Sequence, residues 1–234
     1  MATHYPKSSV EEAESHRIGV LTSIQIPSLA RLETLSDGIF AIVMTLLILD
    51  VKLPTVLHNA SSEDFNSALF AIWPKVGAYV ISFLVLAKCW EIHRQIFHFV
   101  KRSDNKILWA NNFCLLLITL LPFSTSLISE YPQFRLVSAL YCGNMLALPF
   151  LMLLIWKHAA SQMASNGVPD WVIREGAARG VKVTASFAVV FVASLFSSAI
   201  GISLLLILVS MSILVPLFRS ERVREEEAQK TAAL

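Results

Sequence analysis

Apolar runs about 20 residues long recur along the sequence and leave few ways for this chain to fold. An α-helix rises about 1.5 Å per residue, so about 20 apolar residues cross the roughly 30 Å hydrocarbon core of a bilayer. Charged residues make up only 15% of the 234 residues, and the mean hydropathy is +0.62. Soluble domains, in contrast, are about 25% charged. The sequence therefore predicts an all-α integral membrane protein.

Six such runs predict six transmembrane helices. We expect them to be centred on residues 39–53, 68–87, 107–128, 136–155, 181–196 and 199–218. The last two runs are separated only by the sequence SSAIG, which indicates a very tight hairpin. The predicted organisation is an N-terminal tail (1–30), a six-helix domain (31–218) and a C-terminal tail (219–234).

Most Lys and Arg residues lie on one side of the predicted spans. They fall in the N-terminal tail, in the segments 91–106 and 157–182, and in the C-terminal tail. The segments on the other side hold only Lys52 and Arg135. Because Lys and Arg are enriched in cytoplasmic loops, we expect both termini to be cytoplasmic, in a multi-pass protein of the cell (inner or plasma) membrane.

Motifs of catalysis do not occur in the sequence. There is no HExxH, GxSxG or Walker loop, and the three cysteines, Cys89, Cys114 and Cys142, have no CxxC spacing. The net charge of +2 gives no reason to expect a nucleic-acid partner. We therefore expect neither an enzyme, nor a resident cofactor, nor a nucleic-acid partner.

The first predicted helix carries a threonine at its centre. At about 100° per residue, four residues fall within about 60° of one another and form a narrow stripe: Gly38, Ile42, Thr45 and Leu49. Periodicity alone favours a helix-packing seam over a pore, because small residues and threonine commonly line such seams.

Ser36 and Asp37 in the same helix point away from this stripe, by about 120° and 140° from Ile42. A carboxylate in a membrane span needs donors. The candidates are Trp90 and His93 in the second helix, and Asn111 and Asn112 in the third. Asp37 either stabilises the inner end of the first helix or couples to protons, and composition does not separate these two roles.

The sequence RLETLSDG at residues 31–38 resembles the RxxxFSDG signature that begins the first transmembrane helix in the TMEM175 family of potassium channels. Arg31, Ser36, Asp37 and Gly38 match the signature, and Leu35 replaces the usual phenylalanine.

Two further stretches carry the same resemblance. CWEIHRQIF, which contains Trp90 and His93, is similar to the W-x-x-H stretch of the family's second helix. LWANNFCLLLITLLPFSTSLISEY, which contains Asn111, is similar to its third helix. With one six-helix repeat, the chain resembles the single-repeat bacterial and archaeal members.

The resemblance implies a potassium channel without a P-loop, assembled in the bilayer as a homotetramer with the first helix lining the pore. The family's pore positions fall on Ile42, Thr45 and Leu49, which the periodicity had already grouped. Rings of Ile42 and Leu49 would form an apolar constriction. Four Thr45 hydroxyls would hold the permeant K⁺ transiently and favour it modestly over Na⁺.

The polar residues of the signature are then expected to form a packing network with Trp90, His93 and Asn111. This network would hold the stripe toward the axis of the tetramer. A function of another class stays open, namely a proton-conducting channel or a proton-coupled transporter that uses Asp37 and His93.

Overall fold

The protein is a bundle of long apolar helices, seen here in a computed structural model that describes residues 12, 14–17, 29–52, 61–100 and 104–212. Within these ranges there is no strand, and five helical spans are long and apolar enough to cross a bilayer. They are α2 with the 3₁₀ segment η1 (Leu29–Leu46 and Leu47–Asp50), α3 with α4 (Ser62–Ala71 and Trp73–Phe99), α5 with α6 (Asn105–Thr119 and Leu121–Glu130), α7 (Arg135–Ser165) and α8 (Asp170–Phe196).

The predicted helices 68–87, 107–128, 136–155 and 181–196 each fall within one of these spans, and the first, 39–53, overlaps Leu29–Asp50 but was predicted to run past its end. The expected all-α membrane fold is therefore confirmed. The sixth runs along a shorter apolar helix, Ser198–Ser212, and the rest of its predicted range lies outside the described residues. Only Ser197 separates this helix from α8, which makes the hairpin tighter than expected. The count of six crossings, the limits of the two tails and the cytoplasmic placement of both termini stay predictions.

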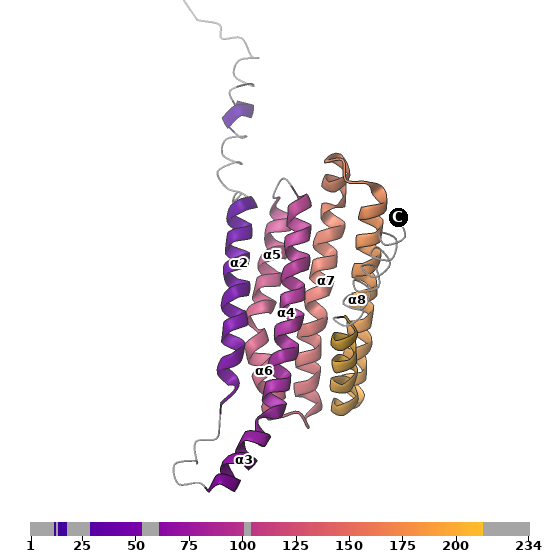
Figure 1. Cartoon of the computed structure of the whole chain (residues 1–234). Coiled ribbons are helices and arrows are strands. Elements are labelled where there is room, and N and C mark those ends of the chain that lie inside the picture. The colour runs from indigo at the N-terminus through magenta and orange to yellow at the C-terminus, as the bar shows by residue number, and fades with distance from the viewer. Residues whose placement is uncertain (1–11, 13, 18–28, 53–60, 101–103, 213–234) are drawn as a thin grey trace, which may run out of the picture.

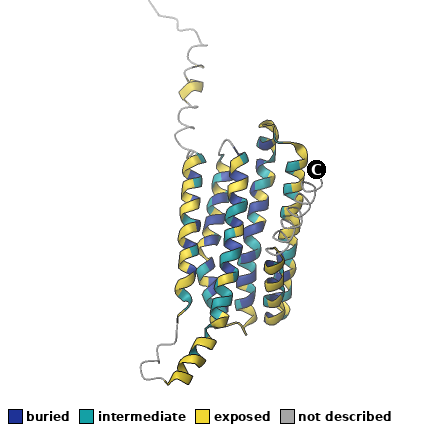
Figure 2. Cartoon of the chain, viewed as in Figure 1, coloured by how far each residue is buried: buried dark blue, intermediate teal, exposed yellow. Residues whose placement is uncertain are grey.

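The spans lie side by side, with α2 at one edge of the bundle and α8 at the other (Figure 1). α2 packs on α4 and α5, and α7 packs most extensively on α8. The buried residues gather where α4, α5 and α7 face one another (Figure 2), and Phe40, Leu86, Phe97, Ile118 and Met145 are among the largest. α2 is therefore supported by the core on one side only.

Several helices are longer than their apolar runs. α4 continues to Phe99, α7 continues to Ser165 and α8 begins at Asp170, so much of the two segments expected to connect helices on the Lys- and Arg-rich side is helical. A helix can continue with polar residues once it has left the hydrocarbon core, because water and headgroups solvate them. The length of an apolar run gives the part of a helix that crosses the membrane and not the whole helix. The helices predicted at 68–87, 136–155 and 181–196 are therefore shorter than α4, α7 and α8.

Proline interrupts two of the spans. The run expected to form one helix at 107–128 is two helices, because Pro122 stands at the start of α6. Pro74 stands in the same way at the start of α4. Proline has no N–H, and its ring clashes with the carbonyl four residues earlier. α3, which begins with a capping box of Ser61 and Asp64, therefore leaves the direction of α4 (Figure 1).

Three buried hydroxyl groups hold α6 against α4 and α7. Ser82 Oγ lies 2.8 Å from Thr125 Oγ1 and 2.8 Å from Tyr141 Oη. Thr125 donates its own hydrogen to Leu121 O, so it accepts from Ser82, and Ser82 then accepts from Tyr141. Each hydroxyl hydrogen has one acceptor, as a site without water requires.

We expect Ser82→Ala to lower the free energy of unfolding by about 1–2 kcal/mol, because it leaves Tyr141 Oη without an acceptor and removes the donor to Thr125. Equilibrium unfolding in mixed detergent micelles measures this. The matched control is Ser186→Ala, since that exposed hydroxyl donates only to Lys182 O one turn earlier; its effect should stay within about 0.5 kcal/mol. Equal losses in the two variants would contradict the role of the hydroxyl group.

Candidate functional site

A buried chain of hydrogen bonds joins α2 to α4 and α5. His93 Nε2 lies 2.7 Å from Asn111 Oδ1, and Asn111 Nδ2 donates to Ser36 Oγ at 3.1 Å. Ser36 Oγ in turn donates to Leu32 O at 2.8 Å. Ser36, His93 and Asn111 are almost completely buried, and we call these three residues the polar cluster.

The directions of these bonds are fixed by chemistry. An amide oxygen only accepts, so His93 donates to Asn111 from Nε2, and the chain of donors ends on a main-chain carbonyl. The His93 ring is also held by its neighbours, stacked on Phe97 with centroids 4.3 Å apart and set edge-on against Phe40 at 5.6 Å. A fully paired and tightly packed cluster of this kind positions helices.

Asp37 lies next to Ser36 of the polar cluster but makes a hydrogen bond of its own, with Trp90 of α4. Its Oδ1 accepts a hydrogen bond from Trp90 Nε1 in α4 at 2.8 Å. Arg94 covers the Trp90 ring, with its Cζ 5.4 Å from the ring centroid. Residues four apart on a helix are neighbours on its surface, so the spacing of Trp90 and Arg94 could have indicated this contact. Asp37 and His93 share no hydrogen bond in the structure.

Three residues that the sequence singled out stand apart from these contacts. Arg31 is exposed at the start of α2 and makes no hydrogen bond or ion pair with another described residue. Asn112 is half-buried, and its side chain makes no hydrogen bond within the described ranges. Gly38 is exposed, and a Cβ built on it would meet no atom within 4 Å, so it opens onto free space.

The stripe lies on the face of α2 that the other helices leave uncovered (Figure 2). Ile42 and Leu49 are each 59% exposed and Thr45 is exposed, whereas Phe40 and Leu47 on the opposite face are buried. The stripe is therefore not a packing seam between the described helices of one chain. Whatever covers the stripe lies outside the residues that the structure describes.

The hydroxyl of Thr45 is oriented by its own helix. Thr45 Oγ1 donates to Ile42 O at 2.7 Å, so its hydrogen is used within the turn. The oxygen lone pairs stay free on the exposed face. Thr45 thus presents an acceptor oxygen outward, with the large apolar side chains of Ile42 and Leu49 on either side along the helix.

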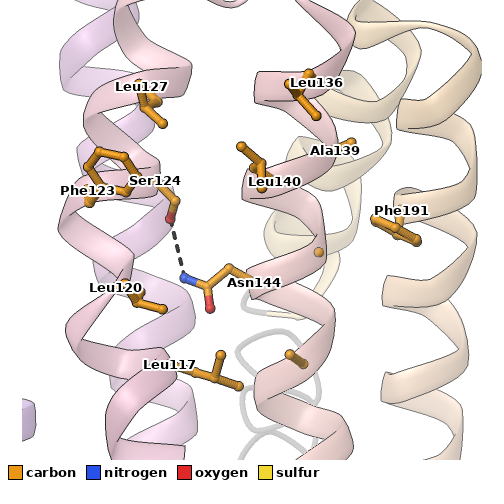
Figure 3. Close-up of a pocket in the computed structure, with 12 residues that line it drawn as sticks. Leu117, Leu120, Phe123, Ser124, Leu127, Leu136, Ala139, Leu140, Asn144 and Phe191 are labelled. Atoms are coloured by element: carbon orange, nitrogen blue, oxygen red, sulfur yellow. Dashed lines mark hydrogen bonds between the residues drawn. The ribbon is translucent and has the colours of Figure 1, made fainter.

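A pocket of about 480 Å³ lies away from this face, between α6 and α7. Its walls are mainly leucine and phenylalanine, and Asn144 Nδ2 donates to Ser124 Oγ across it at 3.3 Å (Figure 3). None of its lining residues is titratable, and none is a site residue predicted from the sequence. The pocket does not supply the acid and base of a catalytic site.

Known proteins resemble this arrangement in sequence and in structure. The sequence model described as endosomal/lysosomal potassium channel TMEM175 matches residues 31–122, which hold the stripe and the polar cluster. The crystal structure of a lysosomal potassium-selective channel TMEM175 homologue from Chamaesiphon minutus superposes with a TM-score of 0.70 at 30% identity, and the match covers 80% of this chain and 96% of that one. The chain belongs to the TMEM175 family.

Relatives within the TMEM175 family carry two different functional names. A potassium channel of Chamaesiphon minutus is 38% identical over 135 residues, which are 56% of this chain and 66% of that protein. The endosomal/lysosomal proton channel TMEM175 of Danio rerio is 28% identical over 125 residues, which are 53% of this chain and 24% of that protein. The aligned parts span less than two thirds of both relatives. Membership of the TMEM175 family thus supports a multi-pass membrane protein.

Neighbouring asparagines provide a test of the polar cluster. We expect Asn111→Ala to lower the free energy of unfolding by about 2–3 kcal/mol, because it leaves the His93 Nε2–H and Ser36 Oγ without their partner. Asn112→Ala is the control and should cost less than about 1 kcal/mol. Unfolding in mixed micelles compares the two variants, and a loss for Asn112→Ala as large as that for Asn111→Ala would contradict the cluster.

Proposed function

We propose that this chain forms a passive, potassium-selective cation channel whose pore is lined by α2. The observation that carries the proposal is the uncovered face of α2, where one acceptor hydroxyl, that of Thr45, stands between Ile42 and Leu49. The name of the bacterial relative, potassium channel, supports K⁺ as the permeant ion.

The pore requires several copies of the chain. α2 lies at the edge of the bundle (Figure 1) and its stripe faces away from the other helices, so one copy cannot enclose a path. Closed rotational symmetry turns the same face of each copy toward a common axis. We propose a homotetramer, the number of copies that the resemblance to single-repeat members implies, in which Ile42, Thr45 and Leu49 each become a ring.

Conduction follows from the chemistry of these rings. The apolar rings empty of water when they are narrow and close the pore, and they pass a partly hydrated ion when they are wide. The acceptor oxygens of Thr45 replace part of the hydration shell of K⁺, which loses water at a lower cost than Na⁺ does. A single ring of hydroxyls gives modest selectivity, and K⁺ stays only transiently.

The contacts of Ser36 and Asp37 set the rotation of α2 about its own axis. These adjacent residues project about 100° apart, and Ser36 is held by Asn111 of α5 while Asp37 is held by Trp90 of α4. Rolling α2 in either direction breaks one of the two bonds. The two anchors thereby keep Thr45 pointing away from the chain.

The second candidate function is a proton channel or proton-coupled transporter, and the name of the Danio rerio relative favours it. It would use Asp37 and His93. The partner of Asp37 in this structure, Trp90 Nε1, is a donor only and does not pass protons on, so the hydrogen bonds favour the positioning role.

Ion flux into proteoliposomes tests the channel. We expect K⁺ to move down its gradient at constant pH without a proton gradient. Thr45→Ala should lower the preference for K⁺ over Na⁺ by up to about tenfold, or about 1.4 kcal/mol, because it removes the acceptor oxygens. Ile42→Asn should raise the flux, since a polar ring holds water. If neither variant changes K⁺ flux or the preference for K⁺ over Na⁺, α2 does not line the pore. The control is Ile200→Asn, at an exposed position of the helix Ser198–Ser212, and it should leave both unchanged.

Asp37→Ala separates the two functions. The positioning role predicts a lower yield of folded oligomer, with K⁺ over Na⁺ preference kept in the channels that do assemble. Size-exclusion chromatography followed by flux at several pH values measures both. Normal assembly together with loss of pH coupling alone would favour a proton pathway through Asp37.

A further inference from the structure

The pocket between α6 and α7 is lined by an asparagine whose oxygen has no partner. Asn144 Oδ1 is buried and makes no hydrogen bond with any residue that the structure describes. Ser138 Oγ shares this property within the described ranges, but Ser138 does not line the pocket. A buried acceptor without a donor is costly in a membrane protein, because lipid cannot supply the donor. Asn144 therefore has a hydrogen-bonding capacity that the fold does not use.

The bonding of Ser124 fixes which atom of the Asn144 amide is left over. Ser124 Oγ donates to Leu121 O at 3.0 Å, so its only hydrogen is used. Ser124 Oγ can then only accept from Asn144 Nδ2, which lies 3.3 Å away. The oxygen of the amide is directed away from Ser124 (Figure 3). The atom without a partner is thus an acceptor, and a ligand that complements it must carry a donor.

The pocket lies deep in the apolar part of the bundle. Asn144 stands about nine residues, or roughly 13 Å of helix, beyond Arg135, where α7 begins. Ser124 stands about six residues, or roughly 9 Å, before Glu130, where α6 ends. A charged donor at this depth would lose its hydration. The group that complements Asn144 Oδ1 is therefore neutral.

The rest of the pocket wall is hydrocarbon. Apart from Ser124 and Asn144, the lining side chains are leucine, phenylalanine and alanine, with Gly143 between them. Phe123, Leu136 and Leu140 are exposed, so the pocket opens on the outer surface of the bundle. Its volume of about 480 Å³ holds a chain of roughly 12 to 16 carbon atoms, since a group the size of a water molecule occupies roughly 30 Å³.

Other occupants of the pocket would leave Asn144 Oδ1 without a donor. The acyl chain of a phospholipid or an apolar side chain of a second copy could fill the space, but neither has a hydrogen to donate. A buried water molecule needs about two to four polar partners, and Ser124 and Asn144 are the only polar side chains in the lining. A hydroxyl group on a hydrocarbon chain meets both requirements of the pocket.

We propose that the pocket binds a lipid-soluble alcohol that enters from the bilayer. Its hydroxyl group donates to Asn144 Oδ1, and its alkyl chain lies along the leucine and phenylalanine side chains of α6 and α7. Because Oδ1 is covered by its neighbours, the amide turns toward the pocket to meet the hydroxyl group. The long bond to Ser124 holds the amide only weakly, and the terminal torsion of asparagine is broad. The site lies apart from α2 and does not depend on which ion the protein conducts.

Photolabelling of the full chain in proteoliposomes tests this site. The probe is tetradecanol with a diazirine in its chain, and mass spectrometry of proteolytic peptides locates the label. We expect the label on the residues of α6 and α7 that line the pocket, and excess tetradecanol should remove most of it. The methyl ether of tetradecanol has no hydrogen to donate and should compete about fivefold more weakly at the same concentration in the bilayer, the ratio expected from one neutral hydrogen bond. Equal competition would show that the pocket takes up hydrocarbon alone and would overturn the proposal.

Two variants separate the hydrogen bond from the space. Asn144→Leu removes the acceptor at similar size, so the alcohol and its ether should compete equally. Ala147→Phe fills the pocket, so the label there should disappear. The control is Asn112→Leu, outside the pocket lining, which should be labelled like the unchanged chain. Size-exclusion chromatography confirms that each variant assembles, and the competition in the unchanged chain needs no variant.

Two further outcomes would contradict the site. If Asn144→Leu still prefers the alcohol to its ether, the hydroxyl group does not bind Asn144. If the unchanged chain carries no label in the pocket, another occupant, such as a second copy, covers it and the proposal fails.

Discussion

The interior of a helix bundle offers no water to polar groups, so the buried Ser36 of α2 needs a partner inside the protein. Asp37 beside it is exposed and also bonds to the bundle. Ser36 bonds to Asn111 of α5 and Asp37 to Trp90 of α4. The polar cluster beyond Ser36 is complete, with His93 as the first donor and a main-chain carbonyl as the last acceptor. The orientation of α2 depends on these two anchors, and the face that it presents depends on its orientation.

The uncovered face of α2 follows from the same arrangement. The bundle packs against α2 from one side, where Phe40 and Leu47 are buried, and leaves Thr45 at the centre of the other. Thr45 uses its hydrogen within its own turn, so it presents acceptor oxygen alone. We propose that this acceptor oxygen, which lies between large apolar side chains, binds a cation together with the Thr45 oxygens of the other copies.

Apolar runs and motifs predict much of this arrangement, because membrane crossing depends on apolar length and the stripe on a fixed helical period. Ser36, Asp37 and Asn111 could be singled out because polar side chains are costly in a span. The bonding of Ser82 with Thr125 and Tyr141 could not be predicted, since single hydroxyls are common in membrane helices and their pairing depends on how three helices meet. The 3₁₀ turn at Leu47–Asp50 could not be predicted either, because its sequence, LILD, holds no glycine or proline to mark a change of winding.

Electron cryomicroscopy of the full chain in lipid nanodiscs tests most directly whether the uncovered face of α2 lines a pore. The account predicts four copies around one axis, with the Thr45 side chain of each copy directed toward that axis. An assembly in which the Thr45 face of α2 lies against lipid, or in which another helix lines the axis, would contradict it.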